Sequence, residues 1–383
     1  MFSPRSKRIA WPLFYFYFFF CSLIGVMMPY LSLHLKAIGF SGTQIGQIFS
    51  LITLSTIVVP HFWGWLTIKL GLPRVTLQLA ILGAFITILP FNFVEQFGYF
   101  WFLMLLFSLF YSSLMPLTDA LVLRSIRNLN VPYTRIRVGG SVGYIVAVTT
   151  AGFIIEAYGT GVIVPLMTAS TLIAVITTFY IYEQPIDKVT KSQKGAFLSL
   201  IKQKEIIFFL ALAFLSYMAH APFNVFFAVH LSAAGYSGEQ IGLLIALGVL
   251  IEIFIFFFIG NRIGKFNVIY LIAFCFACGV FRWFFIAWYA EYLFVAVLTQ
   301  LMHCITFAAF HLVSIQQITR LFPERYLSQG QAMYSGIGIG LGGGIGMVAA
   351  GLLWDFAGGS WTFTAAAIIS TLALVLLAIS QKH

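Results

Sequence analysis

The stretch His34-Leu-Lys-Ala-Ile-Gly-Phe-Ser-Gly-Thr-Gln-Ile-Gly46 returns later in the chain as His230-Leu-Ser-Ala-Ala-Gly-Tyr-Ser-Gly-Glu-Gln-Ile-Gly242. Nine of the thirteen positions are identical, at a constant offset of 196 residues. Each copy joins the first two apolar runs of one half of the chain. Two copies with the same orientation require an even number of membrane crossings between them. The repeat therefore predicts two parallel halves.

The composition is that of a chain whose solvent is largely lipid. Hydrophobic residues make up 61% of the sequence and charged residues only 8%, whereas a soluble domain has roughly 25% charged residues. A membrane-spanning helix needs about 20 apolar residues. Such runs lie near 11–33, 43–66, 75–94, 99–123, 138–157, 161–182, 206–230, 239–260, 267–289, 292–319, 329–353 and 360–380.

These runs predict an all-α membrane protein with twelve transmembrane helices in two parallel six-helix bundles. We expect the first bundle at 1–182 and the second at 205–383. Between them lies a polar linker, 183–204, that contains five lysines.

Positive charge is distributed unequally about these spans. The formal net charge is +10. With an even number of spans, every Lys and Arg except Lys36 and Arg282 falls on one side of the membrane or in a tail. The positive-inside rule then places both termini in the cytoplasm. We therefore expect a multi-pass protein of a bacterial-type inner (plasma) membrane, with lipid rather than nucleic acid as the partner of its basic face.

Several classes of chemistry have no sequence support. The chain contains no nucleotide-binding G-x-x-x-x-G-K-[ST] loop. No nucleophile–base pair or metal-ligating set stands out, so we expect neither an enzyme nor a bound cofactor or metal. Transport driven by an ion gradient remains, with a small-molecule substrate and H+ as partners and a monomer as the working form.

Five ionisable residues are expected inside spans: Asp119, Glu252, Arg282, His303 and His311. Such groups are costly in lipid, so they usually face a cavity and bind or carry ions. Carboxylates in apolar surroundings and histidines can exchange protons near neutral pH. Two structural alternatives stay open: a fixed ion pair between Glu252 and Arg282, and a purely hydrogen-bonding role for His311.

Two basic loops carry a first family resemblance. Gly64-Trp-Leu-Thr-Ile-Lys-Leu-Gly-Leu-Pro-Arg74 and Asn261-Arg-Ile-Gly-Lys265 resemble the major facilitator loop signature G-x-x-x-D-R-x-G-x-R at two symmetric places. The family usually has Asp where this chain has Ile68, and Asn261 replaces the acid in the second loop. The resemblance implies the major facilitator fold, which is built from parallel halves.

The core charges resemble those of the lactose permease group of proton symporters. Matched position by position, that resemblance assigns substrate contact to Asp119, Arg137, Tyr144, Arg282 and His303. Arg137 lies in the motif Arg-x-Arg-x-x-Gly-x-Val-Gly, of which it is the second Arg. The chain departs from the group at Thr306, where the group has Glu, and at Gln300, where it has Lys.

A second resemblance, to the phenylpropionate permease branch, covers nearly the whole chain. Its matching segments include Pro116–Leu121, Gly279–Trp283 and His303–Leu312. The branch implies uptake of an aromatic monocarboxylate. Arg137, Arg282 and protonated His303 would bind its carboxylate. Tyr144, Trp283 and Phe307 would form an apolar wall for its ring. The side chains expected to line the cavity are Trp283, Phe307 and His311.

These observations together predict a proton-coupled symporter that imports a small organic solute by alternating access, most simply an aromatic monocarboxylate such as 3-phenylpropionate. Glu252 and His303 are the expected proton carriers, with Asp119 in reserve. The alternative is a proton symporter for a sugar or nucleoside, favoured by the match at Asp119, Arg137 and Tyr144. An efflux carrier and a non-transporting membrane protein rank below both.

Overall fold

The computed structural model describes residues 4–127, 129, 131–183, 200–258 and 266–380. Every regular element in these ranges is helical, as expected where lipid offers no partner for backbone N–H and C=O groups. The described chain forms two compact units. Unit 1 comprises Met1–Phe40, Ser55–Thr190 and Ser237–Gly242. Unit 2 comprises Ser41–Leu54, Lys191–Tyr236 and Leu243–His383.

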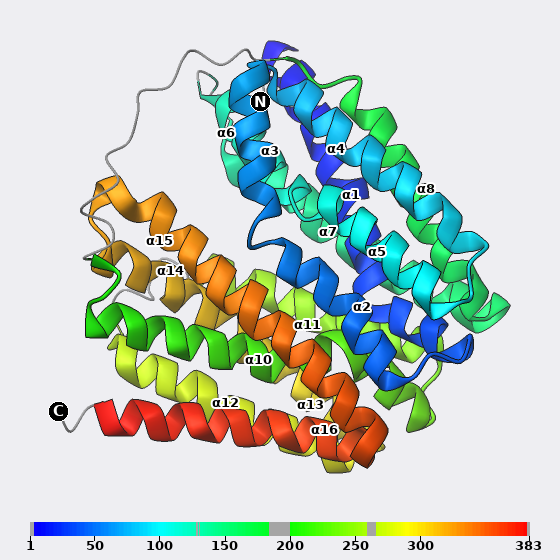
Figure 1. The fold of residues 1–383 in the computed structure, drawn as a ribbon, viewed down its shortest axis with the longest axis vertical. Coiled ribbons are helices and arrows are strands. Elements are labelled where there is room, and N and C mark those ends of the chain that lie inside the picture. The colour runs from blue at the N-terminus through cyan, green and yellow to red at the C-terminus, as the bar shows by residue number, and fades with distance from the viewer. Residues whose placement is uncertain (1–3, 128, 130, 184–199, 259–265, 381–383) are drawn as a thin grey trace. The chain divides into compact units, whose positions relative to one another are not determined.

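Unit 1 is built on a long first helix (Figure 1). Its helices are α1 (Pro4–Ala37), α3 (Val59–Leu70), α4 (Pro73–Ile88), α5 (Phe97–Tyr111), α6 (Leu114–Ile126), α7 (Tyr133–Tyr158) and α8 (Ile163–Thr178). Helix α1 packs along both α7 and α8. Two short 3-10 turns, Leu89–Asn92 and Thr160–Val162, complete the unit.

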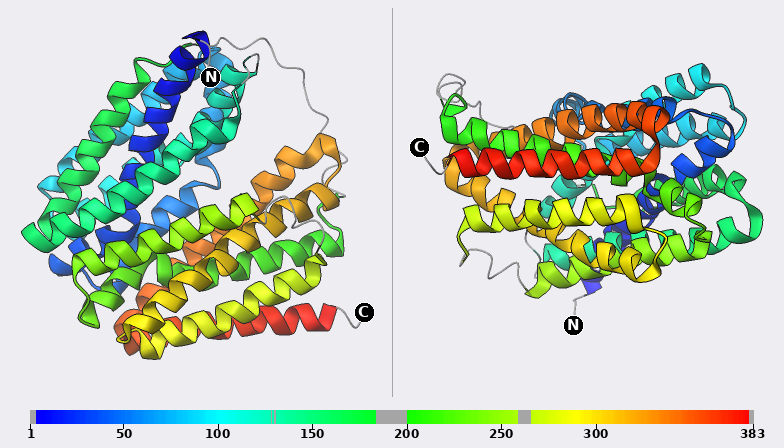
Figure 2. Two further views of the ribbon diagram at one scale, coloured as in Figure 1. Left: turned by 180° about the vertical axis from the view of Figure 1, so that it is seen from behind. Right: turned by 90° about the horizontal axis from the view of Figure 1, so that it is seen from below.

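Unit 2 contains helices from both ends of the chain. They are α2 (Gly42–Ser55), α10 (Lys204–Ala233), α11 (Gly238–Phe258), α12 (Val268–Tyr289), α13 (Leu293–His303), α14 (Phe310–Leu321), α15 (Leu327–Tyr334) and α16 (Gly344–Ser380). Two π-helical segments, Cys304–Ala309 and Ser335–Gly343, interrupt the later helices. Helices α12 and α16 run side by side (Figure 2).

Eleven helices are long and apolar enough to cross a membrane in the described ranges. The last, Glu324–Ser380, has 57 residues. It would be far longer than the roughly 30 Å of hydrocarbon if it were straight. Its course is broken at Gly358, where φ is 81° and ψ is −179°, and the chain reverses direction within α16 (Figure 1). The sequence ranges expected to form two spans, 329–353 and 360–380, both fall within this run.

Two expected features lie outside the described residues. Most of the predicted linker, 184–199, is one of them. The second basic loop, within 259–265, is the other.

The repeated sequence builds the same helix ending in both copies. Gly39 and Gly235 each adopt a φ of 93°, a left-handed conformation that glycine takes without the cost of a Cβ clash. Phe40 N donates to Leu35 O at 2.9 Å, and the corresponding bond in the second copy is 3.1 Å. These 6→1 bonds are typical of a Schellman motif. The glycine and its flanking residues thus terminate α1 and α10 in the same way.

The next four residues of each copy begin a new helix. Ser41 Oγ accepts from Gln44 N at 3.2 Å, and Gln44 Oε1 accepts from Ser41 N at 3.0 Å. Ser237 and Gln240 make the same two bonds at the same lengths. This reciprocal arrangement is a capping box. It explains why Ser and Gln recur at this spacing, and it accounts for much of the internal repeat.

An acid from a different helix completes each of these caps. Asp355 of α16 accepts from Gly42 N at 2.7 Å and from Thr43 N at 2.8 Å, within unit 2. Glu156 of α7 accepts from Gly238 N at 2.7 Å, within unit 1. Carboxylates stabilise helix N-termini because the unpaired N–H groups there carry partial positive charge. The two copies of the repeat therefore end in equivalent electrostatic contacts.

Small residues bring α1 and α7 close together. A Cβ added at Gly25 would lie 2.7 Å from Tyr144 O, and one added at Gly139 would lie 2.7 Å from Phe14 O. Neither position tolerates a side chain, and helices in membranes commonly approach through such residues. This approach brings the polar residues of α1 beside those at the start of α7.

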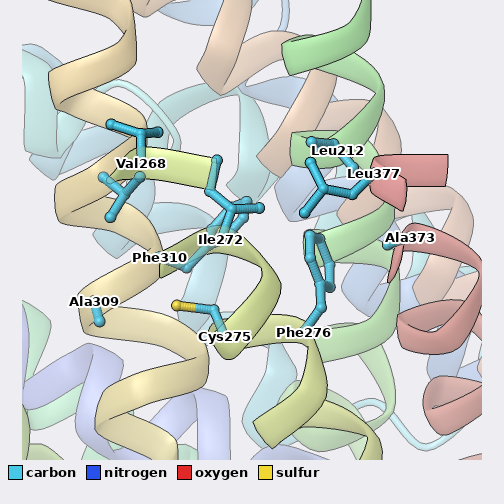
Figure 3. Close-up of a cluster of buried hydrophobic side chains, with 10 residues drawn as sticks. Leu212, Val268, Ile272, Cys275, Phe276, Ala309, Phe310, Ala373 and Leu377 are labelled. Carbon is cyan, nitrogen blue, oxygen red and sulfur yellow. The ribbon is translucent and has the colours of Figure 1, made fainter. Parts of the chain in front are cut away.

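The core of unit 2 joins four parts of the chain. Leu212 of α10, Ile272, Cys275 and Phe276 of α12, Phe310 of α14 and Leu377 of α16 are all buried in one apolar cluster (Figure 3). The thiol of Cys275 is one of its members. This cluster fixes α12 against α14, and so sets the positions of the polar residues that follow on both helices.

Candidate functional site

Arg282 of α12 is completely buried, with 0% relative exposure. Its Nε donates to Thr299 O at 2.9 Å, and its Nη1 donates to Thr306 Oγ1 at 2.8 Å. Thr306 stands where the lactose permease group has Glu, and the structure gives it a direct contact with the guanidinium. Nη2 has no hydrogen-bond partner among the described residues. One arm of this buried cation therefore keeps an unused hydrogen-bond donor.

Two aromatic rings enclose the same guanidinium. Its central carbon lies 4.4 Å from the ring centroid of Phe223 and 4.4 Å from that of Trp283. Cation–π contacts of this kind are worth about 2 kcal/mol or more where water is excluded. Trp283 was expected near the site. Phe223 of α10 was not, because nothing separates it in sequence from the other 41 phenylalanines.

Glu252 of α11 pairs with a histidine rather than with the arginine. His303 Nε2 lies 2.6 Å from Glu252 Oε1. The fixed Glu252–Arg282 ion pair that the sequence left open does not occur within the described residues, where Arg74–Glu183 is the other salt bridge. Imidazole and carboxylate at this distance can share or exchange a proton. The two predicted proton carriers are thus in direct contact.

His303 lies at a change of helical geometry. It ends α13, and the π-helical segment Cys304–Ala309 follows it. Its ring stacks on that of Phe307 with centroids 5.4 Å apart and also lies 5.0 Å from that of Phe223. Single π-helical turns inside α-helices occur frequently at functional sites. The stacking fixes the imidazole against Glu252.

A further histidine, His220 of α10, lies within this cluster. Its Nδ1 lies 2.8 Å from Ser216 O and, facing a carbonyl, carries the proton. Its ring meets that of Trp283 edge to face at 4.9 Å. It lines a cavity of ≈ 10 Å³ together with Trp283 and Thr306, space for about one water molecule. Our sequence reasoning missed His220, although a histidine within an apolar run was a signal that could have found it.

His311 belongs to a different hydrogen-bonded group. Its Nδ1 lies 3.3 Å from Tyr334 Oη, and Tyr334 Oη lies 3.0 Å from Tyr217 Oη. The small cavity beside Arg282 is lined by neither His311 nor Phe307. His303 and His311 are only eight positions apart and have different hydrogen-bonding partners, but His311 also lies close enough to Glu252 to interact with it electrostatically.

In unit 1, Asp119 of α6 is held by two tyrosines. Tyr17 of α1 donates its hydroxyl to Asp119 Oδ1. Tyr133, at the start of α7, donates to the same oxygen at 2.9 Å. Sequence reasoning identified Asp119 but neither tyrosine, because their partnership depends on how α1, α6 and α7 pack.

Arg137 lies over the ring of Tyr17. Its guanidinium carbon is 5.2 Å from the ring centroid. A Cβ added at Gly140 would lie 2.8 Å from Arg137 Nη1, so that glycine leaves room for the guanidinium. Tyr144 follows two turns later on α7 and is partly exposed. The structure therefore groups Asp119 and Arg137 around Tyr17.

The described residues bring no three His, Cys, Asp or Glu side chains into a metal-binding arrangement. Two polar clusters are present instead. In unit 2, a buried cation with an unpaired donor lies near a carboxylate–imidazole pair. In unit 1, a carboxylate and a guanidinium share one tyrosine. Such groups can bind an anion and hold or pass on a proton.

The chain is similar to known transporters over most of its length. The chain is 30% identical over 356 residues to the probable 3-phenylpropionic acid transporter of Escherichia coli K12, covering 90% of each chain. It is 26% identical over 384 residues to the maltose permease of Geobacillus stearothermophilus, covering 99% of this chain and 97% of the permease.

Among solved structures, the nucleoside transporter NupG shares the fold. The TM-score is 0.86 at 16% identity, covering 98% of this chain and 99% of NupG. A model of the MFS_1 like family matches residues 10–365. This chain belongs to the MFS_1-like family and is a major facilitator transporter.

Proposed function

We propose that the protein is a proton-coupled symporter that imports a small aromatic monocarboxylate, such as 3-phenylpropionate, across a bacterial inner membrane by alternating access. In this proposal it works as a monomer with two six-helix halves, 1–182 and 205–383, joined by the linker 183–204. Both termini lie in the cytoplasm, in accord with the positive-inside rule.

The observation that carries the proposal is the state of Arg282. It is fully buried, and its Nη2 lacks a partner among the described residues. An unsatisfied buried donor costs about 1–3 kcal/mol, and more when it is charged. A substrate carboxylate would remove that cost through charge-assisted hydrogen bonds. A buried arginine in this state favours an anionic substrate over a neutral one.

The surroundings of Arg282 favour an aromatic substrate. Phe223 and Trp283 flank the guanidinium, and Phe307 stacks on His303. Aromatic rings attract one another in edge-to-face and offset geometries. A ring attached by a short chain to a carboxylate would meet such walls when its carboxylate reaches Arg282. The name of the Escherichia coli relative points to the same chemical class.

The proton would be carried by Glu252 and His303, with Asp119 in reserve. The 2.6 Å contact between Glu252 and His303 lets the two groups hold one proton between them. A substrate carboxylate bound at Arg282 adds negative charge nearby and so favours protonation of the pair. Substrate and proton would then bind together, as symport requires.

A sugar or nucleoside symporter is the second candidate. Tyr17 and Tyr133 hydrogen-bond Asp119 in unit 1, and hydroxyl-rich substrates suit such groups. The maltose permease is a relative over almost the whole chain. An efflux carrier and a non-transporting membrane protein have no specific contact in their favour.

Uptake by reconstituted vesicles tests the proposal directly. Purified protein would be given labelled 3-phenylpropionate, maltose or uridine, with and without an inward proton gradient. We expect gradient-dependent accumulation of 3-phenylpropionate alone. Its neutral amide should compete at least about tenfold more weakly, because a hydrogen bond to a charged group contributes about 1.5–3 kcal/mol. Accumulation of maltose or uridine instead would establish the second candidate.

A further inference from the structure

A large basic cavity lies in unit 1, away from the polar clusters described above. Its volume is ≈ 680 Å³, and its lining includes Lys7 and Arg8 of α1, Arg74 of α4 and the segment 179–183 after α8. The charge distribution of the sequence assigns this end of the unit to the cytoplasmic side. No part of the proposed transport mechanism uses this cavity.

The cavity carries more positive than negative charge. Among the described residues that line it, Glu183 is the acid, and it already accepts from Arg74 N at 3.0 Å and from Val75 N at 3.2 Å. Arg74 Nε lies 3.8 Å from Glu183, and its Nη1 donates to Ile181 O at 3.1 Å. Arg74 and Glu183 therefore form the structural wall, and Lys7 and Arg8 supply the net charge.

Both of these outer cations are exposed. Lys7 has no ion pair within the described residues, and the guanidinium carbon of Arg8 lies 5.1 Å from the ring centroid of Tyr182. A cation resting on an aromatic face keeps its N–H groups at the ring edge available for an acceptor. Two exposed cations thus line one cavity.

The rim of the cavity has the composition of a membrane interface. Trp11 is 47% exposed, Phe179 68% and Tyr180 70%. Trp and Tyr concentrate at the depth of the lipid headgroups. Basic pockets between helices on the cytoplasmic side are suited to anionic headgroups. The cavity combines both features at one end of α1, α4 and α8.

We propose that this cavity binds the phosphodiester headgroup of an anionic phospholipid. Lys7 and Arg8 would hold the phosphate, while Trp11 and Tyr180 would contact the glycerol and upper acyl region. The bound lipid would add a ligand-mediated contact at the ends of α1 and α8, which already pack against each other.

The test uses the purified full chain in detergent and adds phosphatidylglycerol, phosphatidylcholine or inorganic phosphate. Native mass spectrometry measures how much of each binds. We expect one phosphatidylglycerol to bind at least about tenfold more tightly than phosphatidylcholine. Lys7→Gln and Arg8→Gln should each weaken it about fivefold, and together roughly 25-fold, because each cation near an anionic surface contributes about equally. Lys36→Gln, at the other end of α1, should change nothing.

Other outcomes would overturn the proposal. Equal affinity for the two lipids, or an effect of Lys36→Gln as large as that of Arg8→Gln, would show that no headgroup site exists here. Inorganic phosphate that displaces phosphatidylglycerol at equal concentration would assign the cavity to free phosphate. As a second readout, brominated phosphatidylglycerol should quench the tryptophan fluorescence of the wild type more than that of the Trp11→Phe variant. Equal quenching of the two proteins would mean that the lipid binds elsewhere.

Discussion

Tyr17, fully buried on α1, donates its hydroxyl to the carboxylate of Asp119 on α6, and the same tyrosine presents its ring face to Arg137. One side chain therefore orients two residues that the family resemblance assigned to substrate contact. Tyr133 bonds Asp119 as well, but in the described chain the ring beneath Arg137 is that of Tyr17 and not that of Tyr133. Substitutions at Tyr17 and Tyr133 can therefore distinguish the hydrogen bond to Asp119 from the ring contact with Arg137.

We expect Tyr17→Leu to impair transport more than Tyr17→Phe does. Phenylalanine keeps the ring beneath Arg137 and loses only the hydrogen bond from Tyr17 to Asp119. Asp119 still accepts the hydrogen bond from Tyr133. Leucine loses both, including a cation–π contact of about 0.5–2 kcal/mol. The KM should rise a few-fold for Tyr17→Phe and by roughly 10-fold for Tyr17→Leu, measured at equal amounts of folded protein.

Tyr133→Phe is the matched control for that comparison. It removes one phenol from Asp119 and leaves Arg137 in place, so its KM should match that of Tyr17→Phe. Identical effects of all three substitutions would show that the ring of Tyr17 does not position Arg137.

Sequence patterns identified the charged residues of the site better than their partners. Asp119, Glu252, Arg282 and His303 are conspicuous because charge is rare in this chain. Which residues they contact depends on how the helices pack, and no short sequence pattern indicates that packing. Whether Glu252 would meet Arg282 or His303 depends on the relative depth of α11, α12 and α13.

Two aromatic residues of the candidate site, Tyr17 and Phe223, could not be predicted for a different reason. The sequence has 17 Tyr and 42 Phe, so Tyr17 and Phe223 resemble many lipid-facing rings. The repeat, in contrast, was predictable because its glycines and its Ser–Gln pairs perform local functions. Those functions, a helix stop and a capping box, depend only on residues within a few positions of each other in the sequence.

The hydroxyl of Thr306 should matter to transport because it accepts a hydrogen bond from Arg282 Nη1. Thr306→Val keeps the volume and leaves a second buried donor unsatisfied, at a cost of about 1–3 kcal/mol. If the guanidinium must be correctly oriented for substrate, kcat/KM should fall by roughly 5-fold to 150-fold. Steady-state uptake measures this ratio.

Thr299→Val provides a control on the neighbouring position. Arg282 bonds the backbone carbonyl of Thr299, and the Thr299 hydroxyl bonds Ala296 O instead. This substitution leaves the guanidinium contact intact, so kcat/KM should stay near that of the wild type. An equal loss in both variants would mean that Thr306 acts only through general packing.

Neutralising the proton-carrying pair should separate accumulation from exchange. Glu252→Gln and His303→Gln each remove one titrating member of the 2.6 Å contact. We expect loss of uphill accumulation while substrate exchange across the membrane continues, because exchange needs no net movement of protons. Glu239→Gln, in the first turn of the same helix, should retain both activities. If both site variants still accumulate substrate in a pH-dependent manner, the proton is carried elsewhere and Asp119 is the next residue to test.

The acids that cap the two repeat helices should protect specific amide hydrogens. Asp355 accepts from Gly42 N and Thr43 N, whereas Glu156 accepts from Gly238 N. Asp355→Asn replaces one acceptor oxygen with a donor and removes the charge at the N-terminus of α2. Loss of such a cap costs about 0.5–2 kcal/mol, so hydrogen exchange at Gly42 and Thr43 should accelerate by roughly 2-fold to 30-fold.

Glu156→Gln should have the same effect at Gly238 and none at Gly42, so each variant is the control for the other. Both substitutions conserve shape and remove one negative charge, and both repeats keep their Ser–Gln capping boxes. A faster exchange confined to the capped amides would therefore arise from the lost carboxylate itself. If each variant accelerated exchange equally at both repeats, the effect would reflect general destabilisation of the fold, and the carboxylates would have no local capping function.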